Sequence, residues 1–152
     1  MTPSKIRGFT LIELVVVITI LGILAAFAIP RFISLDATAR AATVNGMAGT
    51  MRSAAALARG MSMATGNAAS VTMEGNPVTL ANNYPDASGA GIDKAINYTL
   101  TDFTFAAGVP AATGTATYQR VGASVPANCQ VSYTPPAVAG AAPAILAVTG
   151  GC

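Results

Sequence analysis

The chain contains no histidine and no tryptophan, and charged residues occupy only 9% of its 152 positions. Without histidine it lacks the commonest metal ligand, the commonest general base and every Ser-His or Cys-His catalytic pair. We therefore predict that the protein is not an enzyme, holds no metal ion and requires no cofactor. The formal net charge of +2 is too small for an electrostatic nucleic-acid surface, so nucleic acid is not an expected partner.

The hydrophobic residues, 53% of the chain, are concentrated near the N-terminus. Residues 14–30 read LVVVITILGILAAFAIP and carry no charge. As an α-helix this run spans about 26 Å, which approaches the ~30 Å hydrocarbon core of a bilayer once residues 10–12 are added. The run therefore predicts one membrane-spanning helix.

The charges that flank this run predict its orientation. Lys5 and Arg7 precede it, whereas Arg31 and Asp36 nearly cancel on the other side. The positive-inside rule then places the N-terminus in the cytoplasm, so the chain after residue 31 is expected to be exported. The alternative is an ordinary secretory signal, cleaved at the small-x-small sequence of residues 26–28.

Glu13 stands at the start of the hydrophobic run, where a plain secretory signal has no use for a carboxylate. An ionised carboxylate costs on the order of 2 to 3 kcal/mol at the bilayer centre and less near the interface. One interpretation is that Glu13 extends to the nearby interface. The other is that it has a function and a charged partner.

The residues around Glu13 carry a family resemblance. The segment KIRGFTLIELVVVITILGILAAFAIPRF closely resembles the N-terminus of type IV pilins and of the related type II secretion pseudopilins. The resemblance implies that a prepilin peptidase cuts between Gly8 and Phe9 on the cytoplasmic side and N-methylates the new amine of Phe9. It also implies that Glu13 acts in subunit assembly. Residues 30–57 resemble the mannose-sensitive haemagglutinin class of type IVa major pilins, which favours a major pilin.

Cleavage after Gly8 would create a cationic amine on Phe9, close to the Glu13 carboxylate. In a filament of staggered helices, Glu13 of an incoming subunit would meet the Phe9 amine of a neighbour and set the register. The spacing of four residues also allows the pair within one chain, and the sequence leaves both arrangements open. Gly22 and Pro30 interrupt a strong helix former, so we expect kinking or local melting there.

An Ala-rich amphipathic pattern follows, and it predicts that the helix extends over residues 9–59 with Gly60 as its stop. Its expected packing face consists of apolar residues near the helical period: Phe32, Leu35, Ala39, Ala42, Met47, Met51, Ala54 and Leu57. The chain then divides into segments with separate roles. These are a leader at 1–8, a transmembrane and filament-core helix at 9–30, an amphipathic half at 31–60 and an exported β domain at 61–152.

The exported domain shows short β-like runs between Gly, Pro and Asn signals. They lie near residues 70–73, 78–80, 97–105, 115–121, 130–133 and 144–148, with a hairpin turn at 74–77. We predict an α+β, pilin-like fold in which a small antiparallel sheet packs against the distal half of the helix.

Cys129 and Cys152 are the only cysteines, and they lie in a segment expected to face an oxidising compartment. A disulfide bond between them would stabilise the fold by roughly 3 kcal/mol through loop entropy. Two free thiols are the alternative. The resemblance to type IV pilins places such a loop on the outside of the filament, so residues 129–152 are a candidate contact surface.

The main functional hypothesis is a structural subunit that polymerises through its hydrophobic helix into a surface filament for adhesion, motility or DNA uptake. A type II secretion pseudopilin and a minor DNA-uptake pilin are the alternatives. The expected partners are further copies of the chain, the prepilin peptidase, the pilus assembly machinery of the inner membrane, and host or surface ligands. The subunit is expected first in the inner membrane and then in the extracellular filament.

Overall fold

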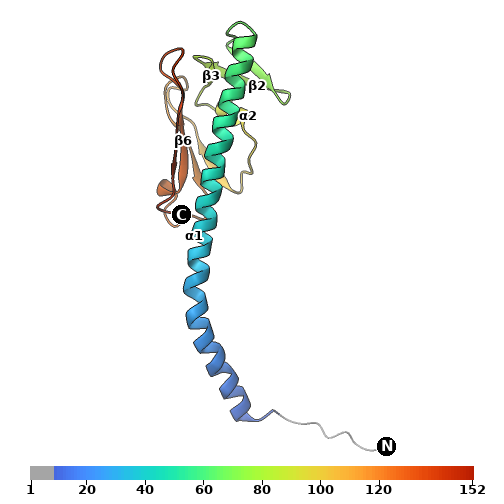
Figure 1. Ribbon diagram of the computed structural model, residues 1–152, viewed down its shortest axis with the longest axis vertical. Coiled ribbons are helices and arrows are strands. Elements are labelled where there is room, and N and C mark those ends of the chain that lie inside the picture. Colours follow the sequence, from blue (N-terminus) through green and yellow to red (C-terminus); the bar gives the residue numbers. More distant parts are fainter. Residues whose placement is uncertain (1–8) are drawn as a thin grey trace, which may run out of the picture. The chain divides into compact units, whose positions relative to one another are not determined.

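The computed structural model describes residues 9–152, so the predicted leader at 1–8 and its last residue, Gly8, lie outside the described part (Figure 1). The described residues fall into two units, of which the first ends at Asp36 and the second is Ala37–Cys152. The long helix α1 (Leu11–Ala64) begins in the first unit and ends in the second. Antiparallel sheets and short helices make up the rest of the second unit, which confirms the α+β fold class.

The helix does not stop at Gly60, and the predicted end was wrong. A single glycine costs only about 1 kcal/mol relative to alanine in a helix, and Ser62 beyond it is fully buried. The chain ends α1 with a Schellman motif instead: Asn67 N–H donates to the Ser62 carbonyl at 2.8 Å, and Gly66 N–H to that of Met63 at 3.3 Å. Gly66 takes the left-handed conformation this motif needs, with φ 78°.

The packing face of α1 differs from the predicted stripe. Met47, Met51 and Ala54 are buried as expected, but Phe32 and Leu35 are 69% and 62% exposed. The buried residues of α1 begin at Val44, and the partly buried Ala41 before it also packs against the core, whereas Phe32 and Leu35 belong to the first unit. The buried residues of α1 recur at three- and four-residue steps: Val44, Met47, Ala48, Met51, Ala54, Ala55, Ala58 and Ser62.

A four-stranded antiparallel sheet supplies the largest buried side chains that share the core with α1. Its strands, in spatial as in chain order, are β4 (Phe103–Ala106), β5 (Ala116–Arg120), β6 (Gln130–Thr134) and β7 (Ala144–Val148). Tyr118, Val131 and Tyr133 are fully buried and join the α1 residues in one hydrophobic cluster. The alternation of buried and less buried residues along β5 and β6 reflects the two-residue period of a strand.

A three-stranded antiparallel sheet is present in addition to the four-stranded one, whereas the sequence predicted a single sheet. It consists of β1 (Ser70–Met73), β2 (Asn76–Ala81) and β3 (Tyr84–Pro85). Met73 pairs with Asn76, so the turn is the two residues Glu74 and Gly75, both with positive φ.

The predicted strand at 97–105 was largely wrong, because only β4 from Phe103 onward is extended and paired. Before it, the Tyr98 ring packs edge-on against the ring of Tyr118 with centroids 5.4 Å apart. The Tyr98 hydroxyl donates to the Asp93 carboxylate at 2.8 Å. These contacts fix the segment through side chains, without strand pairing. The sequence also missed three short elements: β3, α2 (Ile92–Ala95) and the 3-10 turn η1 (Pro126–Asn128).

Candidate assembly site and surface loop

The first turn of α1 is closed by a reciprocal pair of hydrogen bonds between Thr10 and Glu13. The Thr10 backbone N–H and hydroxyl donate to Glu13 Oε2 at 3.0 and 2.8 Å. In return the Glu13 backbone N–H donates to the Thr10 hydroxyl at 3.3 Å. This arrangement is a capping box, with Thr10 at the N-cap and Glu13 three residues later. It satisfies backbone donors that would otherwise have no partner and places an acid at the positive end of the helix dipole.

The sequence analysis missed this partner for Glu13, although the Thr-x-x-Glu spacing at residues 10–13 was a sufficient signal. The carboxylate therefore has a local role in starting the helix. Phe9, one residue before the cap, is described and its side chain is 79% exposed. Pairing of Glu13 with a Phe9 amine, within one chain or between copies, stays a prediction.

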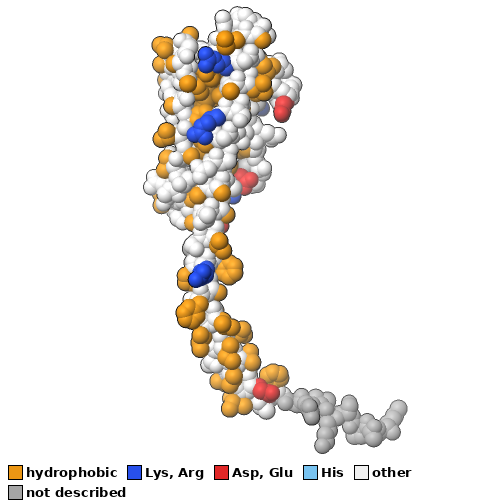
Figure 2. Space-filling view, in the orientation of Figure 1, with side chains coloured by type: hydrophobic (Ala, Val, Ile, Leu, Met, Phe, Trp, Pro, Cys, Tyr) orange, Lys and Arg blue, Asp and Glu red, His pale blue; other side chains and the backbone are white. Residues whose placement is uncertain are grey.

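The helical part of the first unit presents hydrophobic side chains in every direction. The exposed fractions of its large apolar side chains range from 42% for Val15 to 81% for Leu11. Orange side chains accordingly outnumber charged ones on the visible face of this segment (Figure 2). The Thr19 hydroxyl donates to the backbone carbonyls of Val15 and Val16 at 3.0 and 2.8 Å, so it adds no unsatisfied polar group.

By length and composition, α1 can cross a membrane, and it is the one such helix within residues 9–152. The backbone is α-helical at both Gly22 and Pro30. The predicted kinking or melting at these two residues therefore stays a prediction.

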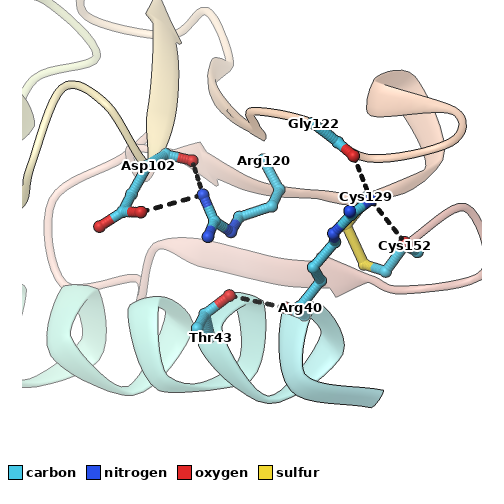
Figure 3. The surroundings of a disulfide bond; sticks show 7 residues. All are labelled: Arg40, Thr43, Asp102, Arg120, Gly122, Cys129 and Cys152. Atoms are coloured by element: carbon cyan, nitrogen blue, oxygen red, sulfur yellow. Dashed lines mark hydrogen bonds and ion pairs between the residues drawn. A yellow bond between two sulfur atoms is a disulfide. The ribbon is translucent and has the colours of Figure 1, made fainter. Parts of the chain in front are cut away.

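The structure contains the disulfide bond between Cys129 and Cys152, which confirms that prediction (Figure 3). Cys129 is fully buried, immediately before β6, and its partner follows β7. The bond therefore closes the hairpin formed by the last two strands of the sheet. Main-chain hydrogen bonds of 2.9 Å, from Gly151 to Asn128 and from Val125 to Gly151, hold the same junction.

Arg40 connects this junction to α1. Its guanidinium donates to the backbone carbonyl of Gly122 and, at 3.4 Å, to that of Cys152 (Figure 3). Nearby, Arg120 pairs with the Asp102 carboxylate at 3.1 Å and donates to its backbone carbonyl at 2.6 Å. Together these two arginines hold main-chain oxygens of three different loops around the disulfide bond.

The loop from 129 to 152 exposes several apolar side chains. Val138 is 64% exposed, and Leu146 and Val148 on β7 are 61% and 36% exposed. On the same side of the neighbouring strand β6 stand the polar residues Gln130, Ser132 and Thr134. A contact role for this loop stays a prediction.

A further polar cluster consists of Asp93, Tyr98 and Tyr118, which are joined by hydrogen bonds. Asp93 Oδ1 accepts hydrogen bonds from Tyr98 and from the fully buried Tyr118, the latter at 3.2 Å. Burial, and then the negative charge of Asp93, raise the pKa of Tyr118 well above its usual range. Among residues 9–152, no three His, Cys, Asp or Glu side chains come together to hold a metal ion.

Comparison with known proteins adds two findings. The family model of the prokaryotic N-terminal methylation motif matches residues 3–29. Three bacterial pilus proteins are similar to part of this chain. The narrow-pilus major component PilA5 of Thermus thermophilus is 52% identical over 54 residues, 36% of this chain and 47% of that protein.

The type IV major pilin protein PilA of Myxococcus xanthus is 62% identical over 34 residues, 22% of this chain and 16% of its own. The major fimbrial protein FimA of Dichelobacter nodosus is 48% identical over 48 residues, 32% of this chain and 31% of its own. The chain thus spans less than half the length of these relatives, and no solved structure matches it significantly. All three relatives are structural proteins of pili or fimbriae, which agrees with the prediction that the chain is not an enzyme.

Proposed function

We propose that this chain, whose N-terminal region is that of a type IV pilin, is the structural subunit of a type IV pilus and polymerises through residues 9–30. The observation that carries the proposal is the surface of the helix over residues 14–30, which is apolar on all sides and whose large apolar side chains are 42% to 75% exposed in the single chain. Such a surface requires lipid or other helices around it. An unassembled subunit meets this requirement in the inner membrane and a polymerised one in the core of a filament.

The energetics favour a filament held by helix packing. Burial of apolar surface from water contributes ~25 cal/mol per Å², but a helix that leaves lipid gains much less from this term. Close packing between helices must then supply the difference, and the small residues Gly22, Ala25 and Ala26 permit close approach. The filament is therefore sensitive to side chains that prevent such packing.

Glu13 contributes alignment in this proposal. The capping box uses Oε2 of its carboxylate, and this leaves acceptor sites for a cationic partner. The amine of Phe9 in a neighbouring subunit, freed after Gly8 and methylated, is the partner we propose. Such a pair gives register more than net stability, because desolvation offsets the attraction between the charges.

Removal of residues 1–8 would also take away Lys5 and Arg7, two of the eight basic residues, and leave six basic against six acidic residues. A subunit with no net charge packs against its copies without long-range repulsion. In the proposed pathway the domain from residue 61 onward lies in the periplasm before assembly and on the filament surface afterwards. Adhesion, motility and DNA uptake are the roles such a filament serves.

The proposal is tested on filaments sheared from cells that express the full chain. Intact-mass measurement should show a chain that begins at Phe9, carries one added methyl group and holds a closed disulfide bond. Recovery of a chain that begins at Ile29 would establish a secretory signal instead, and a freely dissolved monomer without residues 9–30 would also overturn the proposal.

Glu13→Ala tests the alignment role. We expect the variant to reach the membrane in normal amount and to yield few filaments, because both the capping box and the charged partner are lost. Glu13→Gln is the matched control for helix capping, since glutamine also serves in a capping box but carries no charge. Unchanged filament yield from Glu13→Gln would exclude the charge pair.

A further inference from the structure

The second unit carries two arginines on one side of α1 that have no acidic partner among the described residues. Arg59 lies over the Tyr84 ring, 5.1 Å from its centroid, and donates to the Tyr84 hydroxyl at 2.6 Å. Arg52 is exposed and donates to the backbone carbonyl of Ile145 at 3.3 Å. A groove of about 280 Å³, lined by Arg52, Tyr84, Pro143 and Ile145 among others, lies beside them. Blue side chains stand among orange ones on the face of this unit that Figure 2 presents.

A larger groove of about 640 Å³ lies against another side of α1. Leu57 and Met61 of α1 line it, together with Leu100, which is 77% exposed. Its charged residues are Glu74, Asp93 and Lys94, so this groove carries one net negative charge. Because Asp93 is bonded by two tyrosine hydroxyls, Glu74 is the carboxylate available to a partner.

Glu74 occupies a position that the backbone does not favour for it. It has φ 48°, and every other described residue with positive φ is an asparagine or a glycine. The first position of a two-residue hairpin turn of this kind strongly favours asparagine or aspartate, and a bulky side chain there has an unfavourable backbone energy. The turn therefore presents a long acidic side chain at an exposed hairpin tip at some cost in stability.

The two grooves lie on opposite flanks of the same helix. Residues two apart in an α-helix point about 160° apart, and Arg59 is two residues from both Leu57 and Met61. Leu57 and Met61 line the acidic groove together with Glu74. Arg59 stands between them in the sequence, so the arginine face and the acidic groove overlap in position along the helix. A contact between unlike faces leaves one face of each kind free on every copy, and where its rotation does not close into a ring it builds an open helical array, as a filament requires.

We propose that the occupant of the acidic groove is a second copy of this chain, with its Arg52 and Arg59 face set against Glu74 and the exposed Leu57 and Leu100. This inference rests on the proposed function, since it specifies which surfaces of the second unit meet along a filament. Complementary charge fixes the register of the contact, and the apolar side chains of both grooves supply the buried area. An exposed pair of this kind is screened by salt, so the contact weakens as ionic strength rises.

The sharpest test uses two variants of the turn residue that match each other in shape. Glu74→Asp keeps the charge and Glu74→Asn removes it, and both side chains tolerate the left-handed conformation. We expect both variants to be folded and the Glu74→Asn monomer to be at least as stable as the parent in detergent. Filament yield should nevertheless fall several-fold for Glu74→Asn and stay close to that of the parent for Glu74→Asp.

A charge swap then identifies the partner. Arg59→Glu should reduce filament yield, and the double variant Arg59→Glu with Glu74→Arg should restore a large part of it. Filaments of the parent should also dissociate more readily at high than at low salt, whereas those of Glu74→Asn should lose this dependence. Filament yield is measured by shearing and sedimentation and confirmed by electron microscopy.

The outcomes separate this inference from the proposed function. If the parent chain forms filaments and Glu74→Asn forms as many with the same salt dependence, the contact is absent and the pilus function stands. If the swap fails to restore what the single variants lose, Arg59 is not the partner. If the parent forms no filaments at all, the proposed function fails and this inference falls with it.

Discussion

Hydroxyl groups of buried tyrosines each connect separate segments of the second unit through a hydrogen bond. Tyr133 on β6 is fully buried, and its hydroxyl donates to the backbone carbonyl of Pro85 on β3 at 2.6 Å. This bond links the two sheets. We expect Tyr133→Phe to lower the free energy of unfolding by about 1 to 2 kcal/mol, because the Pro85 carbonyl loses its partner in a dry site.

Chemical denaturation of the detergent-solubilised chain measures this loss. Tyr98→Phe is the comparison, and it should cost less because Tyr98 is only partly buried and Asp93 keeps its bond from Tyr118. Equal losses in the two variants would contradict a special role for the bond between the sheets.

The same tyrosines predict how stability changes in alkali. Burial raises the pKa of Tyr133 and of Tyr118 well above the value of about 10 that an unfolded chain has. The unfolded state therefore releases these protons at a lower pH than the native state does. The free energy of unfolding should be flat with respect to these groups below about pH 10 and fall as the pH rises beyond it.

Unfolding curves measured across this pH range check the prediction. In Tyr118→Phe the free energy of unfolding should fall less steeply above about pH 10, because one of the two titrating hydroxyls is absent. Stability that stays constant well above pH 10 would show that these hydroxyls ionise equally in both states.

Contacts between individual side chains were predictable from the sequence where a residue type had one candidate partner. Two cysteines alone allow a single pairing, so the disulfide bond was predictable. Glu13 stands out in the sequence as an acid beside a hydrophobic run, which points to a charged partner, whereas its bond to Thr10 follows from the Thr-x-x-Glu spacing of a capping box. The partners of Tyr133 and Arg40 lie 48 and 112 residues away along the chain, and no local pattern encodes such contacts.

The end of α1 gives a prediction about a whole element. Gly60 lies inside the helix, is exposed, and an added Cβ there meets nothing within 4 Å. Gly60→Ala should therefore raise the free energy of unfolding by roughly 0.5 to 1 kcal/mol, because alanine is the better helix former. Thermal denaturation in detergent measures the change.

Gly151→Ala is the contrasting variant. A Cβ at this position would stand 2.5 Å from the Val125 carbonyl oxygen and 2.7 Å from the Asn128 Cβ. Both neighbours belong to the tightly bonded junction near the disulfide bond, so we expect a clear loss of stability. A stabilised Gly151→Ala variant would mean that this junction adjusts easily.

Whether an element was predictable depended on its length and on what holds it. The strands at 70–73 and 144–148 were found because β-branched and apolar residues stand between clear turn signals. The elements β3 and α2 have two and four residues, too few to show any periodicity. The helix end was missed since Gly60 is a local signal, whereas burial of Ser62 against the sheets is a tertiary effect.

At the scale of the whole molecule, the two units differ in how their apolar side chains are buried. No described residue of the first unit is buried in a core, so this unit depends on its surroundings for burial. The second unit has one hydrophobic cluster shared by α1 and both sheets. Substitutions in the second unit should therefore act mainly on folding, and substitutions in the first mainly on membrane residence and assembly. The surface residues of the second unit, such as Glu74, are the exceptions.

The disulfide bond should contribute strongly to the stability of the second unit. It closes β6 and β7 into one loop, and β7 is the edge strand of its sheet. Replacement of both cysteines, Cys129→Ser with Cys152→Ser, should lower the free energy of unfolding by about 3 kcal/mol, because the unfolded chain regains the entropy of the open loop.

Unfolding of the parent with and without reductant, beside the double variant, measures this contribution. The parent should lose the same stability on reduction, and reductant should leave the double variant unchanged. The β7 edge is expected to open first, since Arg40 and the backbone bonds of Gly151 would then hold the junction alone. Backbone amide exchange that stays equally slow across β6 and β7 after reduction would show that packing, not the covalent bond, holds this end of the molecule.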